Sequence, residues 1–144
     1  NWIGWSELSW TDDAGKITTS RDLLARTVFY KVGHHGSHNA TLNGSEADAH
    51  ANLGWMARGA YSEEFVAAIP ANTEWALSKS RPWVHPLPKI EEALMDKARG
   101  RVFRTDRDRV ARPSKSVMPD ADWDLFQSRT REEDLYFEYT IEDR

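Results

Sequence analysis

Apolar and polar positions along the chain predict strands and helices in turn. Residues 26–32 (RTVFYKV) are β-branched and aromatic and end at Gly33, a pattern typical of a buried strand. Three more runs of this kind predict strands: TEWALSK (residues 73–79), RVFRT (101–105) and LYFEYTI (135–141). Residues 1–10, which carry three tryptophans, predict a short strand or a buried segment.

Helical spacing of apolar residues alternates with these strands. It predicts helices over residues 20–25, 45–58, 62–69, 88–99 and 123–127. The helix over 88–99 has the clearest limits, with Pro88 in its first turn and Gly100 at its end. An alternation of strands and helices predicts an α/β fold, a sheet with crossover helices.

Composition narrows the class of protein. The chain has 144 residues, enough for one domain with a core, and a net charge of −4, which does not indicate a nucleic acid or a membrane as partner. It has no cysteine, so disulfides and thiolate metal sites are excluded; the compartment stays open, with the cytoplasm preferred. A start on Asn1 rather than Met suggests a piece of a longer protein.

Histidines gather in KVGHHGSHNAT, residues 31–41, which holds three of the five in the chain. A histidine at the carboxyl end of a strand faces the crevice where α/β proteins keep their sites. The flanking glycines allow the backbone to turn sharply, and neighbouring imidazoles can serve a metal and a substrate oxygen. The alternative is a solvated loop that happens to be rich in histidine.

The order of motifs along the chain resembles the C-terminal half of metallo-β-lactamase-fold hydrolases. VFYKVGHHGS (residues 28–37) is followed by His85-Pro86, an amphipathic helix and VFRTD (102–106). The nearest branch is the hydrolase domain of bacterial competence DNA-uptake proteins. The resemblance implies one mixed sheet with flanking helices, half of an αββα sandwich. It would occupy residues 1–110, with an insertion near 43–60, and residues 111–144 would form a C-terminal extension.

Two parts of the family's site are missing from this chain. The motif His-x-His-x-Asp-His is absent, and so is the bridging aspartate of a Gly-Asp turn. The resemblance implies two zinc ions in a complete parent site, and zinc takes three or four protein ligands. We therefore expect the chain to lack an N-terminal half and to bind zinc weakly or not at all on its own.

The resemblance also implies roles for particular residues. His85 is the expected metal ligand, and His34 and His35 are expected at the site as ligands, phosphate partners or proton donors. Adjacent strand-end residues tend to point opposite ways, so which of the two faces inward stays open. Gly36 and Ser37 are expected to bind an anionic substrate oxygen, and Asp106 to orient a site histidine. At least one of His34 and His35 should lie within about 8 Å of the His85 ring.

The resulting hypothesis is a fragment of a metal-dependent hydrolase that acts on a phosphoester or other ester-like bond. A non-catalytic binding module of the same fold is the alternative, and an unrelated α/β adaptor is a third. The expected partners are the missing N-terminal half and a second copy of the chain, bound through an open sheet face. Nucleic acid is a further candidate partner, and the arginine-rich residues 99–115 would bind it. The alternative is that residues 99–115 form a solvated hairpin with no binding role. No membrane partner is expected.

Overall fold

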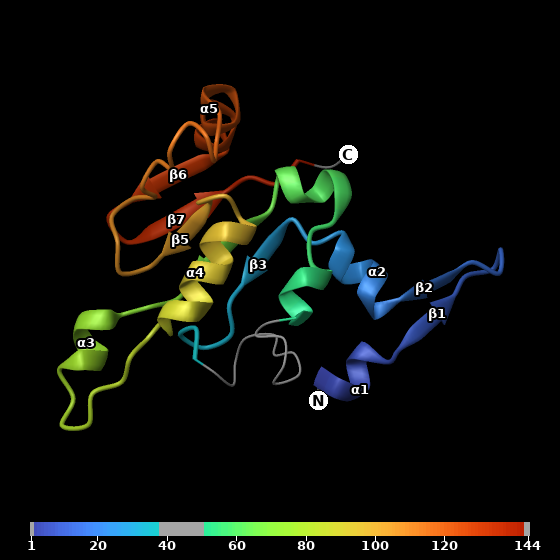
Figure 1. The fold of residues 1–144 in the computed structure, drawn as a ribbon, viewed down its shortest axis with the longest axis horizontal. Helices are drawn as coiled ribbons and strands as arrows, with labels where there is room; N and C mark the ends of the chain where they lie inside the picture. The colour runs from blue at the N-terminus through green and yellow to red at the C-terminus, as the bar shows by residue number, and fades with distance from the viewer. Residues whose placement is uncertain (1, 38–50, 143–144) are drawn as a thin grey trace. The chain divides into compact units, whose positions relative to one another are not determined.

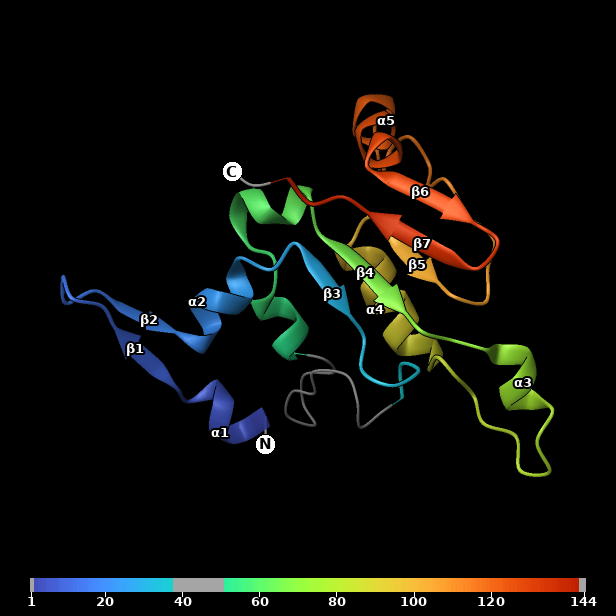
Figure 2. The ribbon, with the colours of Figure 1, turned by 180° about the vertical axis from the view of Figure 1, so that it is seen from behind.

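The computed structural model describes residues 2–37 and 51–142. Figures 1 and 2 show the chain from opposite sides. It divides into two compact units, Asn1–Val28 with Leu42–Phe65, and Phe29–Thr41 with Val66–Arg144. Residues 111–142 thus belong to the same unit as the His85 loop.

The first unit consists of short elements around a hairpin. Its elements are α1 (Trp2–Ser6), β1 (Ser9–Thr11), β2 (Ile17–Thr19), α2 (Ser20–Ala25) and the 3₁₀ helices η1 (Ala51–Trp55) and η2 (Gly59–Glu63). β1 and β2 pair antiparallel. Thr19 and Asp22 form a capping box that begins α2, since each side chain satisfies a backbone N–H of the other. This local signal explains why α2 begins where the sequence predicts.

The second unit is built on a three-stranded parallel sheet. Its strands β3 (Phe29–Lys31), β4 (Val66–Ile69) and β5 (Val102–Arg104) lie in the order β3-β4-β5. The crossover from β4 to β5 contains α3 (Thr73–Leu77) and α4 (Pro88–Lys97). The α/β class predicted from the sequence is confirmed. The single mixed sheet is not found in the described part of the chain, which has this sheet and two separate hairpins.

The two faces of the parallel sheet have different coverings. α4 covers one face, and its Ile90 and Leu94 are fully buried. The alternating positions Phe29, Ala68 and Phe103 share the opposite face because a strand repeats every two residues.

A helix and a hairpin follow the sheet in the chain. They are α5 (Asp120–Ser128), β6 (Thr130–Glu133) and β7 (Tyr136–Tyr139). Rings from both pack against Phe103, with centroids 5.1 Å away for Phe137 and 5.7 Å for Phe126. The C-terminal segment is therefore packed against the sheet through aromatic contacts.

Several predicted elements are found where expected, and others are wrong. Strands within 26–32, 101–105 and 135–141 and helices within 20–25 and 88–99 are confirmed, and the helix predicted over 123–127 is confirmed within the longer α5. The strand predicted at 73–79 is the helix α3, because the side chain of Asn72 accepts from the N–H of Trp75 and caps a helical turn. The helix predicted over 62–69 is η2 followed by β4, the central strand, whose short apolar run does not distinguish strand from helix.

Three further differences concern single segments. Only the end of the helix predicted over 45–58 lies within the described residues, and there the backbone is the 3₁₀ helix η1. The N-terminal segment begins with α1 and reaches the predicted strand only at its end, in β1, and no side chain from residue 4 to residue 10 is buried. β6, with the sequence TREE, was not predicted; its pairing with β7 forms the strand without any apolar alternation. No helix in the described ranges combines the length and apolar character that crossing a bilayer requires.

Candidate functional site

The candidate site lies at the carboxyl edge of the parallel sheet. His35 follows β3, Pro70 follows β4 and Asp106 follows β5. The Nδ1 atom of His35 lies 2.7 Å from the carbonyl oxygen of Pro70. A carbonyl only accepts hydrogen bonds, so Nδ1 of a neutral His35 ring carries the proton and Nε2 keeps its lone pair. This arrangement is the one in which a histidine is fixed to serve as a metal ligand or a base.

His85 lies beside His35, on the loop that joins α3 to α4. The two ring centroids are 6.0 Å apart in an edge-to-face arrangement, which confirms the proximity predicted from the sequence. The Nδ1 atom of His85 is buried and has no hydrogen-bond partner. Both rings line a pocket of about 20 Å³ together with Asn72, Trp75, Ala76 and Trp83, enough space for about one water molecule.

The structure answers which histidine of the pair lies beside the His85 loop. Both side chains are exposed, but His35 contacts Pro70 and His85, and His34 has a positive φ of 47°. His38 lies outside the described residues.

Gly36 holds the two histidine loops together through its backbone. Its φ is +72°, and a Cβ there would lie 2.8 Å from the Cβ of Pro86. Its carbonyl accepts from the N–H of Leu87 at 3.1 Å, and its own N–H donates to Gly33 at 3.1 Å. Binding of an anionic oxygen to the Gly36 N–H would have to replace that last bond. Ser37 is half-buried next to it.

A cluster of charged side chains, Arg104, Glu91 and Asp106, lies next to the histidine loops at this edge of the sheet. Arg104 makes five hydrogen bonds, as many as a guanidinium has N–H groups: two each to Glu91 and Asp106, and one to Thr73. Its side chain is 9% exposed, against 22% for Glu91 and 15% for Asp106. The hydrogen bond from Arg104 is the main reason that the pKa of Asp106 lies well below its usual value, and the same bond raises the pKa of Arg104.

Asp106 acts on the backbone of the His85 loop. Its Oδ2 atom lies 2.6 Å from the hydroxyl of Thr73, which in turn lies 3.0 Å from the carbonyl oxygen of His85. The N–H of Thr73 donates to the same Oδ2 at 3.0 Å. The bonds of Asp106 therefore run to Arg104 and Thr73 rather than to an imidazole. Sequence reasoning found Asp106 and missed Thr73, Arg104 and Glu91, whose distant positions give no local signal.

The donor atoms of the site fit part of a zinc centre. The unprotonated nitrogen of His35 and the unpartnered ring nitrogen of His85 are imidazole donors, which zinc prefers. In the stretches 2–37 and 51–142, no three or more His, Cys, Asp or Glu side chains come together as a metal-binding group. Zinc takes three or four protein ligands. The pair is thus a partial set, and ligands from elsewhere would have to complete it.

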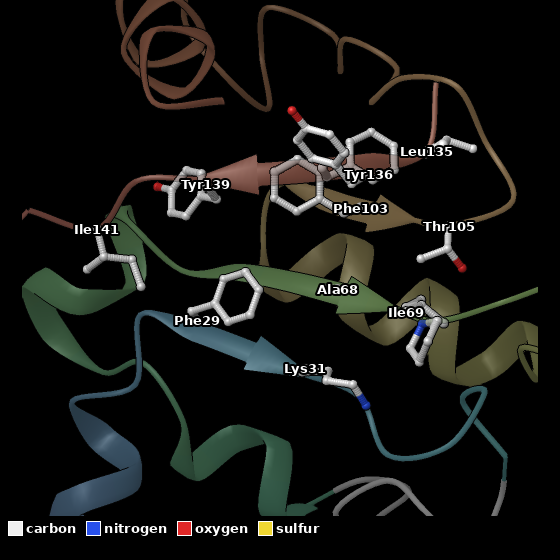
Figure 3. A pocket seen from close by; sticks show the side chains of 12 residues that line it. Phe29, Lys31, Ala68, Ile69, Phe103, Thr105, Leu135, Tyr136, Tyr139 and Ile141 are labelled. Carbon is white, nitrogen blue, oxygen red and sulfur yellow. The ribbon is translucent and has the colours of Figure 1, made fainter. Parts of the chain in front are cut away.

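A larger apolar pocket lies on the sheet face opposite α4. It has a volume of about 430 Å³, within the usual range of ligand and partner sites. Figure 3 shows Phe29, Phe103 and Tyr139 gathered around it, with Lys31 at the carboxyl end of β3. Pro70 belongs to both sites, since it lines this pocket while its carbonyl binds His35.

Comparisons with known proteins return no relatives. No protein-family model, no curated protein and no solved structure matches the chain. The fold and the site define an α/β protein with a histidine pair, His35 and His85, at the carboxyl edge of its parallel sheet.

Proposed function

We propose that the chain is the C-terminal half of a metal-dependent hydrolase of the metallo-β-lactamase fold, acting on a phosphoester or other ester-like bond. The observation that carries the proposal is the 6.0 Å juxtaposition of His35 and His85 at the sheet edge. It joins two motifs, HHGS and HP, that lie some fifty residues apart and match the family in order. Zinc is the expected metal because its sites favour imidazole ligands.

The chain's own residues would hold and orient the ligands. His35 offers Nε2 because the Pro70 carbonyl fixes its other nitrogen. The backbone carbonyl of His85 can accept from the hydroxyl of Thr73, whose own N–H is bound by Asp106. His35 and His85 would hold part of a zinc site, and zinc bound in a completed site would supply an activated water and polarise the oxygen of the ester. His34, exposed at the same edge, remains a candidate proton donor to the leaving group.

The apolar pocket supports the view that a second layer packs on this sheet. In a sandwich of two sheets the inner faces lie about 10 Å apart and bury each other's apolar side chains. Here the inner position Phe29 is 37% exposed, although Tyr139 stacks on it at 6.3 Å. The missing N-terminal half, or a second copy of the chain, would cover this face.

Zinc titration of the isolated chain tests the ligand assignment. We expect the imidazole proton signals of His35 and His85 to shift together in NMR spectra, and those of His34 to respond less. Binding should be at least ~100-fold weaker than at four-ligand zinc sites, because two ligands give far less binding energy. His35→Ala and His85→Ala should abolish the response, while His34→Ala preserves it. Tight binding of two zinc ions, or a response that depends on His34 alone, would refute the proposal.

Self-association tests the open sheet face. On this face α5 and β7 already bury Phe103, so the apolar surface still exposed to water is the part around Phe29. Because burial of that remaining apolar surface is favourable, light scattering should show concentration-dependent dimers or larger species. Phe29→Asp, on the sheet face, should reduce this association. Trp75→Asp is the matched control, because Trp75 is 49% exposed but lies on α3. A wild-type chain that stays monomeric at all concentrations would show that the face needs no second layer.

The alternative function is a binding module of the same fold without catalysis. The pocket of about 430 Å³ favours it, since it is lined mainly by apolar side chains and one cation, Lys31. The coding sequence that precedes Asn1 separates the two: a His-x-His-x-Asp-His motif followed by a Gly-Asp turn supports the hydrolase. If that sequence lacks both, the binding module becomes the better interpretation.

A further inference from the structure

A segment of the second unit projects away from the sheet. It comprises α3 and the loop that follows, residues 73–84, and both Figure 1 and Figure 2 show it at one end of that unit. We call this segment the projecting loop. Four of its apolar side chains are each about half exposed: Trp75 (49%), Leu77 (52%), Trp83 (50%) and Val84 (57%). Apolar groups concentrated at such a tip usually mark an interaction site.

The exposed groups do not form one flat patch. Trp75 and Leu77 are two residues apart in α3, so they point to roughly opposite sides of the helix. The Trp75 and Trp83 rings meet edge to face at 6.1 Å, and the ammonium group of Lys79 lies 3.8 Å from the Trp75 ring centre. Apolar surface is thus presented on more than one side of the loop, as in a segment that is immersed rather than one that rests on a flat partner.

The local charge is opposite in sign to that of the chain. The projecting loop contains Lys79, Arg81 and one acid, Glu74, a net charge of +1, whereas the whole chain has a net charge of −4. A basic, apolar tip on an acidic protein is complementary to an anionic surface. Tryptophan, lysine and arginine are also the residues that suit a boundary between apolar and polar phases, because each has an apolar body and a polar end.

We propose that the projecting loop inserts into the headgroup region of an anionic lipid bilayer, as a peripheral contact and not as a span. Leu77 and Val84 favour acyl chains over nucleic acid, since aliphatic side chains have no flat face on which a base can stack. The edge-to-face tryptophans likewise offer no pair of parallel stacking planes. Because the Trp83 ring lies 6.1 Å from that of His85, such binding brings the histidine pair close to the membrane surface. The proposal holds whether or not the site binds a metal.

Vesicle flotation with the full chain tests the proposal. We expect the chain to float with vesicles that mix phosphatidylcholine and phosphatidylglycerol, and much less with phosphatidylcholine alone. High salt should weaken the binding, because salt screens the attraction between the loop's cations, Lys79 and Arg81, and the anionic headgroups. The double variant Trp75→Ala/Trp83→Ala and the single variant Leu77→Asp should each reduce partitioning about tenfold or more. Lys79→Glu/Arg81→Glu should remove the preference for the anionic vesicles.

Trp10→Ala provides the matched control. Trp10 is 44% exposed, close to the values of Trp75 and Trp83, but it lies on β1 in the first unit. The Trp10→Ala substitution should leave partitioning into vesicles unchanged. The circular dichroism spectrum of every variant should match that of the wild type. Equal flotation of the wild type and Leu77→Asp, a substitution at a side chain that is 52% exposed, would overturn the proposal. So would binding of a single-stranded oligonucleotide through Trp75 and Trp83 without any binding to vesicles.

Discussion

Replacing Arg104 by Met should lower the free energy of unfolding by about 3 kcal/mol or more. The Arg104 side chain is 9% exposed and bonds two carboxylates, those of Glu91 and Asp106. Without it, Asp106 keeps its charge in a partly buried place with only the neutral donors of Thr73, and Glu91 keeps only the exposed Arg107. Urea denaturation followed by circular dichroism measures the loss.

Arg107→Met is the control for this substitution. Arg107 bonds the same Glu91 at 2.9 Å, but its side chain is 50% exposed, so the change should cost less than about 1 kcal/mol. A cost for Arg104→Met no larger than that of Arg107→Met would show that the cluster does not stabilise the edge.

Acid titration gives a second readout of the same cluster. The pKa of Asp106 is lowered in the folded chain from an ordinary value of 3.8, chiefly by the bond from Arg104. A lowered folded-state pKa means that this stabilisation is fully present above the ordinary pKa and is lost as the pH falls below it. In Arg104→Met this component of the acid sensitivity should be much smaller than in the wild type.

Gly36→Ala should destabilise the second unit by about 2–4 kcal/mol and separate the histidine loops. Two causes add. The φ of +72° disfavours any residue with a Cβ, and the new Cβ would meet Pro86 at 2.8 Å. Pro86 has to shift, and it adjoins His85. NMR contacts between the His35 and His85 rings should weaken, together with the joint response of the two rings to zinc.

Gly15→Ala separates the two causes. Gly15 has a similar φ of +78°, but a Cβ there meets nothing within 4 Å, so only the backbone strain remains, about 1 kcal/mol. Equal costs for the two substitutions would mean that the contact with Pro86 does not hold the histidine loops in place.

Much of the second unit could be predicted from local sequence signals. The strand ending at Gly33 and the helix from Pro88 each have a clear apolar pattern and a residue that limits the backbone. Irregular loops at His35 and His85 are likewise predicted, because glycines flank the first and prolines flank the second. These features depend on residues that are neighbours in the chain, so local sequence patterns are enough to predict them.

Tertiary contacts decided the rest. His34 and His35 are equivalent in local sequence, and only the Pro70 carbonyl, 35 residues away, distinguishes the one that is fixed beside His85. β4 is a strand because it is paired on both sides, by β3 and β5. Arg104 pairs with Glu91 because β5 packs against α4. Each of these outcomes depends on the free energy of contacts between residues far apart in the chain, which no local pattern records.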